Sequence, residues 1–519
     1  MAKLLQNERT KLYKKPSTWV LSGVVILLML STVVLLKVIN IISANNNYYY
    51  SQADAWKDVY QSNLQSNEWQ LENEPDNIQV QMEIAKYKYL LDNEIPPSDW
   101  RTDAVAAYYE ALGNLKSETA MMESGEPSYP EDQMKEHIAA YTAQVEGYKK
   151  VLDNGNWKDF LRLRIEFIKS GYTDSSIMDV PQTPQEQEVF IRVLQMQIDM
   201  DIEPVPTTYS WLTKTSPNQW KVNKLSTLQK NELSLLRGEV INDMVGEPQP
   251  LTSSAKAKLE KENKIILKEL QTNTPPVDED GFLGMLDSTT GNLSLIGVLL
   301  VVLAGGIIAG EFGSGTVKLL LITPHKRQKI FWAKAVLLLE ITGLILAGMF
   351  VLSFLTSAAF NGFGGIGDMV VISVFGNVVR LPFLLIIVLK YLLYMLPVLA
   401  YGGLALMLSA VTRKSAVSIA VSLLLMFGSK AGMLMVVLGS VAMLGAPLPG
   451  LKFLLFANED LSVYFPGVSS LMEKMFGMNT SLATFEPTMS LGFTVSVLLV
   501  YLICFLWIGR DSFCRRDIQ

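Results

Sequence analysis

The residues that most often carry catalysis or bind metals are scarce in this sequence. Only two histidines, His137 and His325, and two cysteines, Cys504 and Cys514, occur among its 519 residues. A His/Cys metal site is close to excluded on that count. We also find no spacing of a nucleophile with a base, or of paired carboxylates, that would argue for hydrolysis. We therefore expect no catalytic residue, no metal and no cofactor bound by this chain.

One stretch has the residue types of a phosphate-binding loop, 310-GEFGSGTVKLLLITPHKRQKIFWAKA-335. A Walker A loop needs Gly-x-x-x-x-Gly-Lys-[Ser/Thr] after a buried strand, because backbone N–H groups and the lysine surround the phosphates. Here Gly315 is followed by Thr316 and Val317, and the nearest lysine is Lys318. An apolar segment of membrane-spanning length precedes the stretch, where the motif requires a strand. The sequence thus argues against nucleotide binding by this chain.

The elements around this stretch are apolar segments long enough to cross a bilayer, which takes about 20 residues. We predict an all-α membrane protein with six transmembrane helices and a large, mainly helical extracytoplasmic domain between the first and second. The predicted spans are 18–42, 291–310, 331–357, 383–411, 415–441 and 489–509. In the expected arrangement residues 1–17 are a cytosolic N-terminal segment, which the family resemblance described below implies to be an amphipathic elbow. Residues 43–290 are the outer domain and 311–330 a cytosolic loop. The segment 442–488 is too polar to span and is interpreted as amphipathic or re-entrant.

Charge is distributed unevenly along the chain. Residues 45–290 carry 40 acidic and 23 basic residues, a net charge of −17, whereas the remainder carries 10 acidic and 21 basic residues, a net charge of +11. Lys and Arg gather on the cytoplasmic side of short loops. Four basic clusters fall on one face if both termini are cytosolic, which places residues 43–290 outside. The clusters are Lys3, Arg9, Lys11, Lys14 and Lys15; Lys318, Lys326, Arg327, Lys329 and Lys334; Arg413 and Lys414; and Arg510, Arg515 and Arg516.

The first span could also be a cleaved signal peptide, since a basic segment precedes it and Ser43-Ala44 ends it with small residues. Its apolar stretch, Trp19 to Ile42, is long for a signal-peptide core of about 7–15 residues, and we favour an uncleaved anchor. Aromatic residues from Tyr48 to Trp69 follow this span. They are interpreted as an interfacial belt and core anchors, with a ligand-binding patch as the alternative.

Two charges lie far from either end of a predicted span, Glu340 in the third and Lys430 in the fifth. A lone charge at the centre of a bilayer costs at least about 2.5 kcal/mol, so each should have a partner or a wet cavity. One hypothesis pairs the two residues with each other. The alternative has Lys430 extend to the headgroups, with Glu340 protonated or at a dimer interface. Lys390, near the outer end of its span, is interpreted as an ordinary residue whose ammonium reaches the interface.

The segment 311–330 has the composition of a bent connector between two spans. Glu311 lies where the second span ends, and Gly313 and Gly315 allow a tight turn. The run 316-TVKLLLI-322 predicts a short helix with an apolar side, which Pro324 ends. The simplest interpretation is a basic interfacial loop that obeys the positive-inside rule.

The segment also resembles the cytosolic loop of ABC-2-type transporter permeases. The typical pattern there is an acidic residue, Gly-Thr, Lys, an apolar run, Pro, Arg and a closing Lys, which correspond here to the stretch from Glu311 to Lys334. The opening 7-NERTKLYKKPSTWVL-21 is similar to the elbow before the first span of that family, and 513-FCRRDI-518 is similar to its basic tail. Residues 45–285 resemble no family.

The resemblance implies that 311–330 is a coupling helix that docks into a separate ATP-hydrolysing subunit. The residues it would assign to this coupling site are Glu311, Gly313, Gly315, Thr316, Val317, Lys318, Leu319, Leu320, Leu321, Pro324 and Arg327. ATP and Mg would be bound by that partner, so this chain would be non-catalytic.

The expected function is therefore the permease subunit of an ABC-2-type transporter, an exporter, in a bacterial cytoplasmic membrane. A complete unit would need two ATPase chains and a second permease chain, identical or different, with no nucleic acid partner. The rival interpretation is a membrane receptor or scaffold whose outer domain senses a ligand and signals to a cytosolic partner without transport. The sequence does not identify a substrate, and a membrane-bound hydrolase is disfavoured because no catalytic constellation is visible.

Overall fold

The computed structural model describes residues 2–48, 55–124, 130–171, 181, 183–206, 216–241, 248–314, 326–374, 376–428, 432, 435–437, 439–440, 443, 448, 450–468 and 489–515. The chain divides into two compact units. We call Met1–Asn40 with Val240–Gln519 the membrane unit, and Ile41–Glu239 the helical unit. Each is considered by itself.

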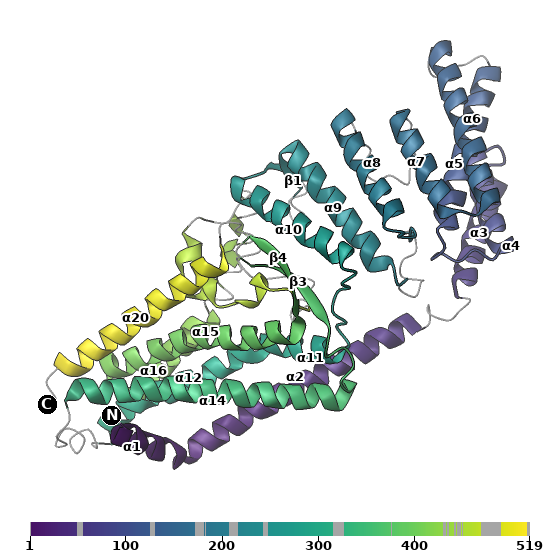
Figure 1. Ribbon diagram of the computed structural model, residues 1–519. Helices are drawn as coiled ribbons and strands as arrows, with labels where there is room; N and C mark the ends of the chain where they lie inside the picture. Colours follow the sequence, from purple (N-terminus) through teal and green to yellow (C-terminus); the bar gives the residue numbers. More distant parts are fainter. Residues whose placement is uncertain are drawn as a thin grey trace. The chain divides into compact units, whose positions relative to one another are not determined.

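The helical unit is a series of helices in which each packs on the next along the chain (Figure 1). Side-chain caps and left-handed glycines set several of the helix ends. The Asn77 side chain accepts a hydrogen bond from the Val80 N–H at one N-terminus, and Gly155 ends α6 at φ 64°, a conformation that glycine adopts without strain. The helices are α3 (Ala55–Asn73), α4 (Ile78–Asp92), α5 (Arg101–Ser124), α6 (Glu131–Asn154), α7 (Trp157–Lys169), α8 (Pro184–Asp199) and α9 (Gln219–Arg237).

Aromatic side chains recur in the core of the helical unit. Tyr60 and Tyr148 are fully buried, and the ring of Tyr148 lies 5.5 Å from that of Phe167 in an edge-to-face arrangement. Large rings bury much apolar area per side chain and add a geometric preference to the packing. The prediction that this part of the chain is mainly helical is confirmed.

The membrane unit contains long apolar helices with short elements between them (Figure 1). Its helices are α1 (Ala2–Tyr13), α2 (Pro16–Tyr48, of which residues to Asn40 belong to this unit), α10 (Ser253–Gln271), α11 (Phe282–Ser288), α12 (Ser294–Gly313), α14 (Arg327–Asn361), α15 (Phe383–Thr412), α16 (Ser415–Leu423) and α20 (Leu491–Arg515), with short turns η2 (Thr289–Leu293), η3 (Leu424–Gly428), η4 (Leu451–Phe453), η5 (Leu455–Asn458) and η6 (Ser462–Tyr464). Two short antiparallel pairs complete it: β1 (Glu239–Ile241, starting at the unit boundary) with β2 (Pro248–Pro250), and β3 (Met369–Val374) with β4 (Asn377–Pro382).

Helix α12 is the most enclosed of the spans, with α14, α15 and α16 packed around it. Small residues allow these helices to approach closely, since a Cβ added at Gly402 would lie 2.5 Å from the side chain of Leu300. Hydroxyl groups then bond across the contact. Ser409 Oγ donates to the Gly305 carbonyl at 2.8 Å and accepts from the Ala309 N–H at 2.9 Å.

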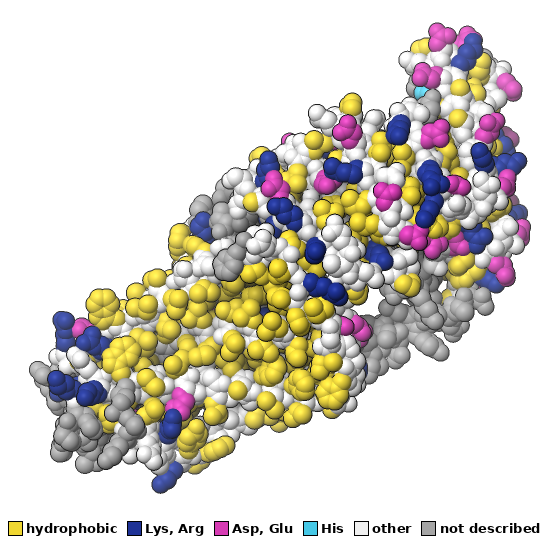
Figure 2. All heavy atoms as spheres, viewed as in Figure 1, with side chains coloured by type: hydrophobic (Ala, Val, Ile, Leu, Met, Phe, Trp, Pro, Cys, Tyr) yellow, Lys and Arg dark blue, Asp and Glu magenta, His cyan; other side chains and the backbone are white. Residues whose placement is uncertain are grey.

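On the face shown in Figure 2, apolar side chains cover the long apolar helices of the membrane unit, whereas charged side chains are scattered over the helical unit. On α14, α15 and α20, side chains such as Leu344, Leu392 and Val500 are well exposed. A continuous apolar surface of this kind is strongly disfavoured in water and is what the hydrocarbon layer solvates. The chain is a predominantly α-helical membrane protein.

Five of the six predicted spans correspond to described helices long and apolar enough to cross a membrane. These are the helices at 18–35, 282–313, 327–361, 383–412 and 491–515. The predicted span 415–441 begins as an apolar helix at Ser415–Gly428, most of its remainder lies outside the described residues, and it stays a prediction. The β3–β4 hairpin was not predicted from sequence. It follows the glycine-rich turn after α14, and its Val-rich strands had no separate signal beside the adjoining spans.

Candidate functional site

The candidate site is a cluster of four charged side chains where α1, α12 and α14 meet, and we call it the elbow cluster. Glu8 and Lys11 are three residues apart on α1 and therefore share one face of the helix. Glu311 comes from the last turn of α12, and Lys334 from the second turn of α14. Three segments that are far apart in the sequence thus contribute to one site.

Lys334 is the centre of the elbow cluster. Its side chain is 0% exposed, and its ammonium lies 2.8 Å from Glu8 Oε2 and 2.9 Å from Glu311 Oε1. The third neighbour of Lys334 Nζ is the carbonyl of Ile307, at 3.4 Å, near the C-terminal end of α12. A cation is favoured at that end because the last carbonyls of a helix carry partial negative charge. All three ammonium donors thus have an acceptor.

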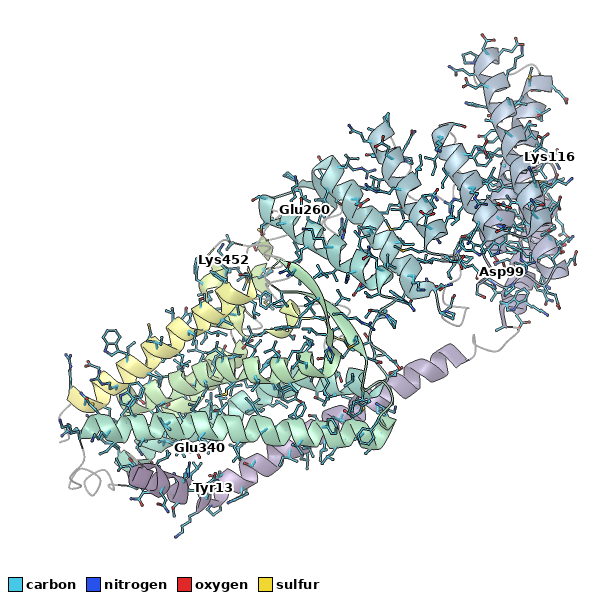
Figure 3. All side chains as sticks on the ribbon, viewed as in Figure 1. Tyr13, Asp99, Lys116, Glu260, Glu340 and Lys452 are labelled. Carbon is cyan, nitrogen blue, oxygen red and sulfur yellow. The ribbon has the colours of Figure 1, made fainter. Side chains whose placement is uncertain are left out.

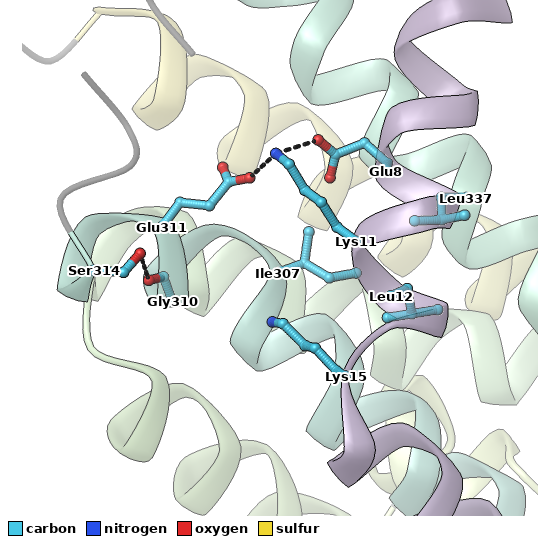
Figure 4. A pocket seen from close by; sticks show the side chains of 9 residues that line it. All are labelled: Glu8, Lys11, Leu12, Lys15, Ile307, Gly310, Glu311, Ser314 and Leu337. Atoms are coloured by element: carbon cyan, nitrogen blue, oxygen red, sulfur yellow. Dashed lines mark hydrogen bonds and ion pairs between the residues drawn. The ribbon is translucent and has the colours of Figure 1, made fainter. Parts of the chain in front are cut away.

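Lys11 closes the cluster from the more open side. Its ammonium lies 3.1 Å from Glu8 Oε1 and 2.9 Å from Glu311 Oε1, as drawn in Figure 4. The Lys11 side chain is 49% exposed, against 10% for Glu8 and 12% for Glu311. Two carboxylates and two ammonium groups alternate, so the buried charges are balanced.

The ionisation of the two α1 residues follows from these contacts. Burial opposes ionisation of Glu8, but the ammonium groups of Lys334 and Lys11 outweigh it and hold the pKa of Glu8 below its ordinary value. Burial likewise opposes the charge on Lys11, and the carboxylates of Glu311 and Glu8 outweigh it and raise the pKa of Lys11 above its ordinary value. Both residues are therefore charged at neutral pH.

Apolar and surface contacts also hold α1 against α14. Leu12 is buried in a cluster with Leu337 and Ile341. On the other side of α1, Arg9 forms an ion pair with Glu340, with 3.0 Å between Arg9 Nε and Glu340 Oε2, and Glu340 projects from α14 toward α1 (Figure 3). The described partner of Glu340 is thus a residue of the N-terminal helix. Lys430, the partner hypothesised from sequence, lies outside the described residues.

The structure describes only part of the coupling site that the sequence suggested. Glu311 and Gly313 end α12, and Arg327 begins α14, where its guanidinium lies 3.4 Å from the carbonyl of Cys514. The remaining predicted residues lie outside the described part of the chain; they are Gly315, Thr316, Val317, Lys318, Leu319, Leu320, Leu321 and Pro324. What is described is therefore the pair of ends from which that segment starts and to which it returns.

Sequence reasoning missed Glu8 and Lys11 as site residues. It placed Lys334 in a basic cluster and at the close of the stretch from Glu311, but not among the site residues. The spacing Glu8-x-x-Lys11 indicates two side chains on one face of a helix, but the spacing alone does not show which other helix packs against that face. Lys334 stands between Trp332 and a long apolar run, which was a signal that its side chain enters the helix packing.

A second buried ion pair joins α15 to α11. Lys390 on α15 and Asp287 on α11 are each 2% exposed, with 2.7 Å between Nζ and Oδ1. The Val468 N–H donates to Asp287 Oδ2 at 3.0 Å, and Gly467 passes so close to both charged groups that a Cβ there would collide with them. The interpretation of Lys390 as a residue reaching the headgroups was wrong. Its partner lies in 43–290, the region that sequence analysis assigned to the outer domain.

Hydroxyl groups continue this second centre. Tyr391 OH donates to Ser353 Oγ at 3.0 Å and lies 2.9 Å from Thr289 Oγ1. One turn along α15, Tyr394 OH donates to Asp460 Oδ1 at 3.0 Å. These contacts join η2, α14 and α15 to the segment 450–468, and they satisfy polar groups in a packed region that offers no bulk water. No group of three or more His, Cys, Asp or Glu residues suited to a metal occurs among the described residues.

A family model matches the C-terminal half of the chain. Residues 272–519 match a family model described as a protein of unknown function, DUF2705. The chain is 27% identical over 241 residues to the uncharacterized membrane protein YdbK of Bacillus subtilis (strain 168), which covers 46% of this chain and 85% of that protein. It is 29% identical over 226 residues to the uncharacterized protein YhcI of the same organism, which covers 43% of this chain and 65%, less than two thirds, of that protein.

The name of YdbK agrees with the apolar helices in indicating a membrane protein. Neither relative's name states an activity. The matched region includes Glu311 and Lys334 of the elbow cluster and both members of the second ion pair. Glu8 and Lys11 precede it in the chain.

Proposed function

We propose that this chain is the permease subunit of an ABC-2-type, ATP-driven transporter, acting as an exporter in a bacterial cytoplasmic membrane. In this proposal a separate ATPase subunit, present in two copies and binding ATP and Mg, docks on 311–330, and a second permease chain completes the unit. Both termini lie in the cytosol and residues 43–290 outside.

The observation that carries the proposal is the bond between Glu311 and Lys334, at 2.9 Å. These residues are the acidic start and the closing lysine of the stretch that resembles the coupling loop of ABC-2 permeases. Because Glu311 and Lys334 form an ion pair, the end of α12 and the start of α14 are held together on either side of the segment that connects them. A force applied to the connector reaches α12 and α14 together, and it reaches α1 through Glu8.

The basic residues assigned to the cytosol support the same orientation. Arg413 at the end of α15 lies over the ring of Phe312, with 4.8 Å from Cζ to the ring centroid. Arg327 lies beside Cys514 at the end of α20, and Lys11 binds Glu311. All four predicted basic clusters therefore have members at one end of the helices, as the positive-inside rule requires of cytosolic segments.

The test is affinity purification of the full chain from its native membranes, with ATPase activity measured in the eluate. We expect wild type to bring down an ATPase subunit. Charge reversal at Lys318 combined with Asp substitutions at Leu319–Leu321 should lose it, because both the cation and the apolar face of the docking segment are removed. A matched control, Lys452→Glu, reverses one charge at the other end of the membrane unit (Figure 3) and should retain the subunit.

Retention of the ATPase after the Lys318 and Leu319–Leu321 changes would refute the docking assignment. Wild type that carries no ATPase from native membranes would favour the receptor or scaffold instead. Orientation is tested separately by labelling single cysteines at residues 150 and 320 in intact cells. Labelling of both positions from the same side would refute the proposed topology.

A further inference from the structure

A cavity of about 290 Å³ lies beside the elbow cluster, between α1 and α12 (Figure 4). Its walls combine charged side chains with the apolar Leu12, Ile307 and Leu337. Lys11 and Lys15, both exposed, form its open side. The volume is just below the range of about 300–1,000 Å³ for small-molecule sites, so the cavity suits a small polar group with a short apolar continuation.

The charge of this cavity favours an anion. Glu8 and Glu311 are already neutralised by Lys11 and Lys334, and Lys15 adds a third ammonium group to the two carboxylates. No ion-pair partner of Lys15 occurs among the described residues, and its side chain extends toward α12 (Figure 4). Lys11 has three donors and uses two of them on carboxylates. Both ammonium groups that line the cavity therefore have donors that no described carboxylate uses.

The position of the cavity along α1 and α2 identifies where that anion would come from. Lys15 precedes by three residues the start of the first candidate span at Thr18. Trp19 and Tyr13 flank it, both exposed, and Trp19 Nε1 donates to the Tyr13 carbonyl at 2.9 Å. Exposed Trp and Tyr at a span end occupy the headgroup level of a bilayer. The cavity thus opens at the depth where phospholipid phosphates lie.

We propose that the cavity between α1 and α12 binds the headgroup of an anionic phospholipid, with Lys15 and Lys11 on the phosphate and the glycerol backbone against Leu12, Ile307 and Leu337. A bound lipid would rest on the side chains that hold α1 to the ends of the connector. Lipid composition would then adjust how firmly the elbow cluster is held. The proposal does not depend on the transport function, since its readout is lipid binding by the chain itself.

The test is native mass spectrometry of the purified, delipidated full chain, titrated with phosphatidylglycerol or with phosphatidylcholine of the same acyl chains. We expect tighter binding of phosphatidylglycerol. Lys15→Ala should weaken it about fivefold, the effect of roughly 1 kcal/mol per basic residue near an anionic headgroup. The matched control Lys14→Ala removes the same charge from a neighbouring exposed residue that does not line the cavity, and it should change the affinity less than twofold.

A second pair of variants fills the cavity without removing a charge. Gly310 lines it, and a Cβ added there meets nothing within 4 Å, so Gly310→Leu should keep the fold and weaken phosphatidylglycerol binding at least fivefold. Gly306, on the same helix and equally open, does not line the cavity, and Gly306→Leu should bind as wild type.

Three results would overturn the proposal. Equal losses for Lys14→Ala and Lys15→Ala would mean that attraction is spread over the basic surface. Unchanged binding in Gly310→Leu would mean that the lipid lies elsewhere. Free glycerol 1-phosphate carries the phosphate without acyl chains. If it displaced bound phosphatidylglycerol as effectively as added phosphatidylglycerol does, the cavity would be assigned to a soluble phosphate instead of a lipid.

Discussion

Replacing Lys334 with methionine should release α1 from α14. Methionine keeps the length of the side chain but removes the buried ammonium, so that Glu8 and Glu311 share Lys11 alone. Breaking a buried ion pair by removing one partner costs about 3–5 kcal/mol, because the remaining charge stays buried and uncompensated. We expect a loss of this size in the free energy that keeps α1 docked.

Two further variants test whether the loss of charge balance causes the undocking of α1 in Lys334→Met. Arg9→Met breaks the Arg9–Glu340 pair, whose side chains are 44% and 38% exposed, and an exposed pair contributes only about 0–1 kcal/mol. The double variant Lys334→Met with Glu8→Gln leaves one carboxylate and one ammonium group in the elbow cluster. It should therefore recover at least half of the loss caused by Lys334→Met alone.

The assay is the protection of a cysteine placed at Ile341, which is buried beneath α1, in a chain whose native cysteines, Cys504 and Cys514, are replaced by alanine. The rate of thiol modification in detergent micelles, relative to the unprotected rate, gives the free energy of opening at this site. A loss in Lys334→Met no larger than that in Arg9→Met would refute the reasoning. The reasoning would also be refuted if the double variant lost as much docking free energy as the sum of the losses in Lys334→Met and Glu8→Gln, or more.

The same physics makes two further predictions. Asp287→Ala should destabilise the membrane unit by about 3–5 kcal/mol because it leaves Lys390 buried without its anion, whereas the double change of Asp287 and Lys390 to leucine should cost less; SDS-induced unfolding in mixed micelles measures both, and equal costs would contradict the ion-pair account. The docking of α1 should also depend on pH. The pKa of Glu8 is lowered by folding, so the stability it contributes is present above its ordinary pKa of 4.5 and is lost as pH falls through the lower folded value. The pKa of Lys11 is raised by folding, so the stability it contributes is present below its ordinary pKa of 10.5 and is lost as pH rises through the higher folded value. Protection of the α1 backbone amides, corrected for intrinsic exchange rates, should therefore be constant between about pH 5.5 and 9.5 and fall at more acidic and more alkaline pH; a change within that window would argue against these two groups as the titrating residues.

The apolar helices were predictable from sequence because a membrane span is a local property. A run of about 20 apolar residues specifies a crossing whatever the rest of the chain does, and the helices at 327–361 and 383–412 contain the spans predicted at 331–357 and 383–411. The helical character of the region after the first span was also local, because it follows from helix-forming composition and period.

The pairing of the charges was decided only by the tertiary structure. Lys334 and Lys390 both resembled interfacial lysines in the sequence, and both are buried on carboxylates supplied by distant segments. The sequence determined that these charges stand beside apolar runs, and the residue types of the stretch from Glu311 to Lys334 pointed to a connector between two helices. The packing of α1 and α12 on α14 determined that the ends of the connector meet at Lys334. The physical reason is that the energy of a buried charge depends on which helices become its neighbours, and no spacing within one helix carries that information.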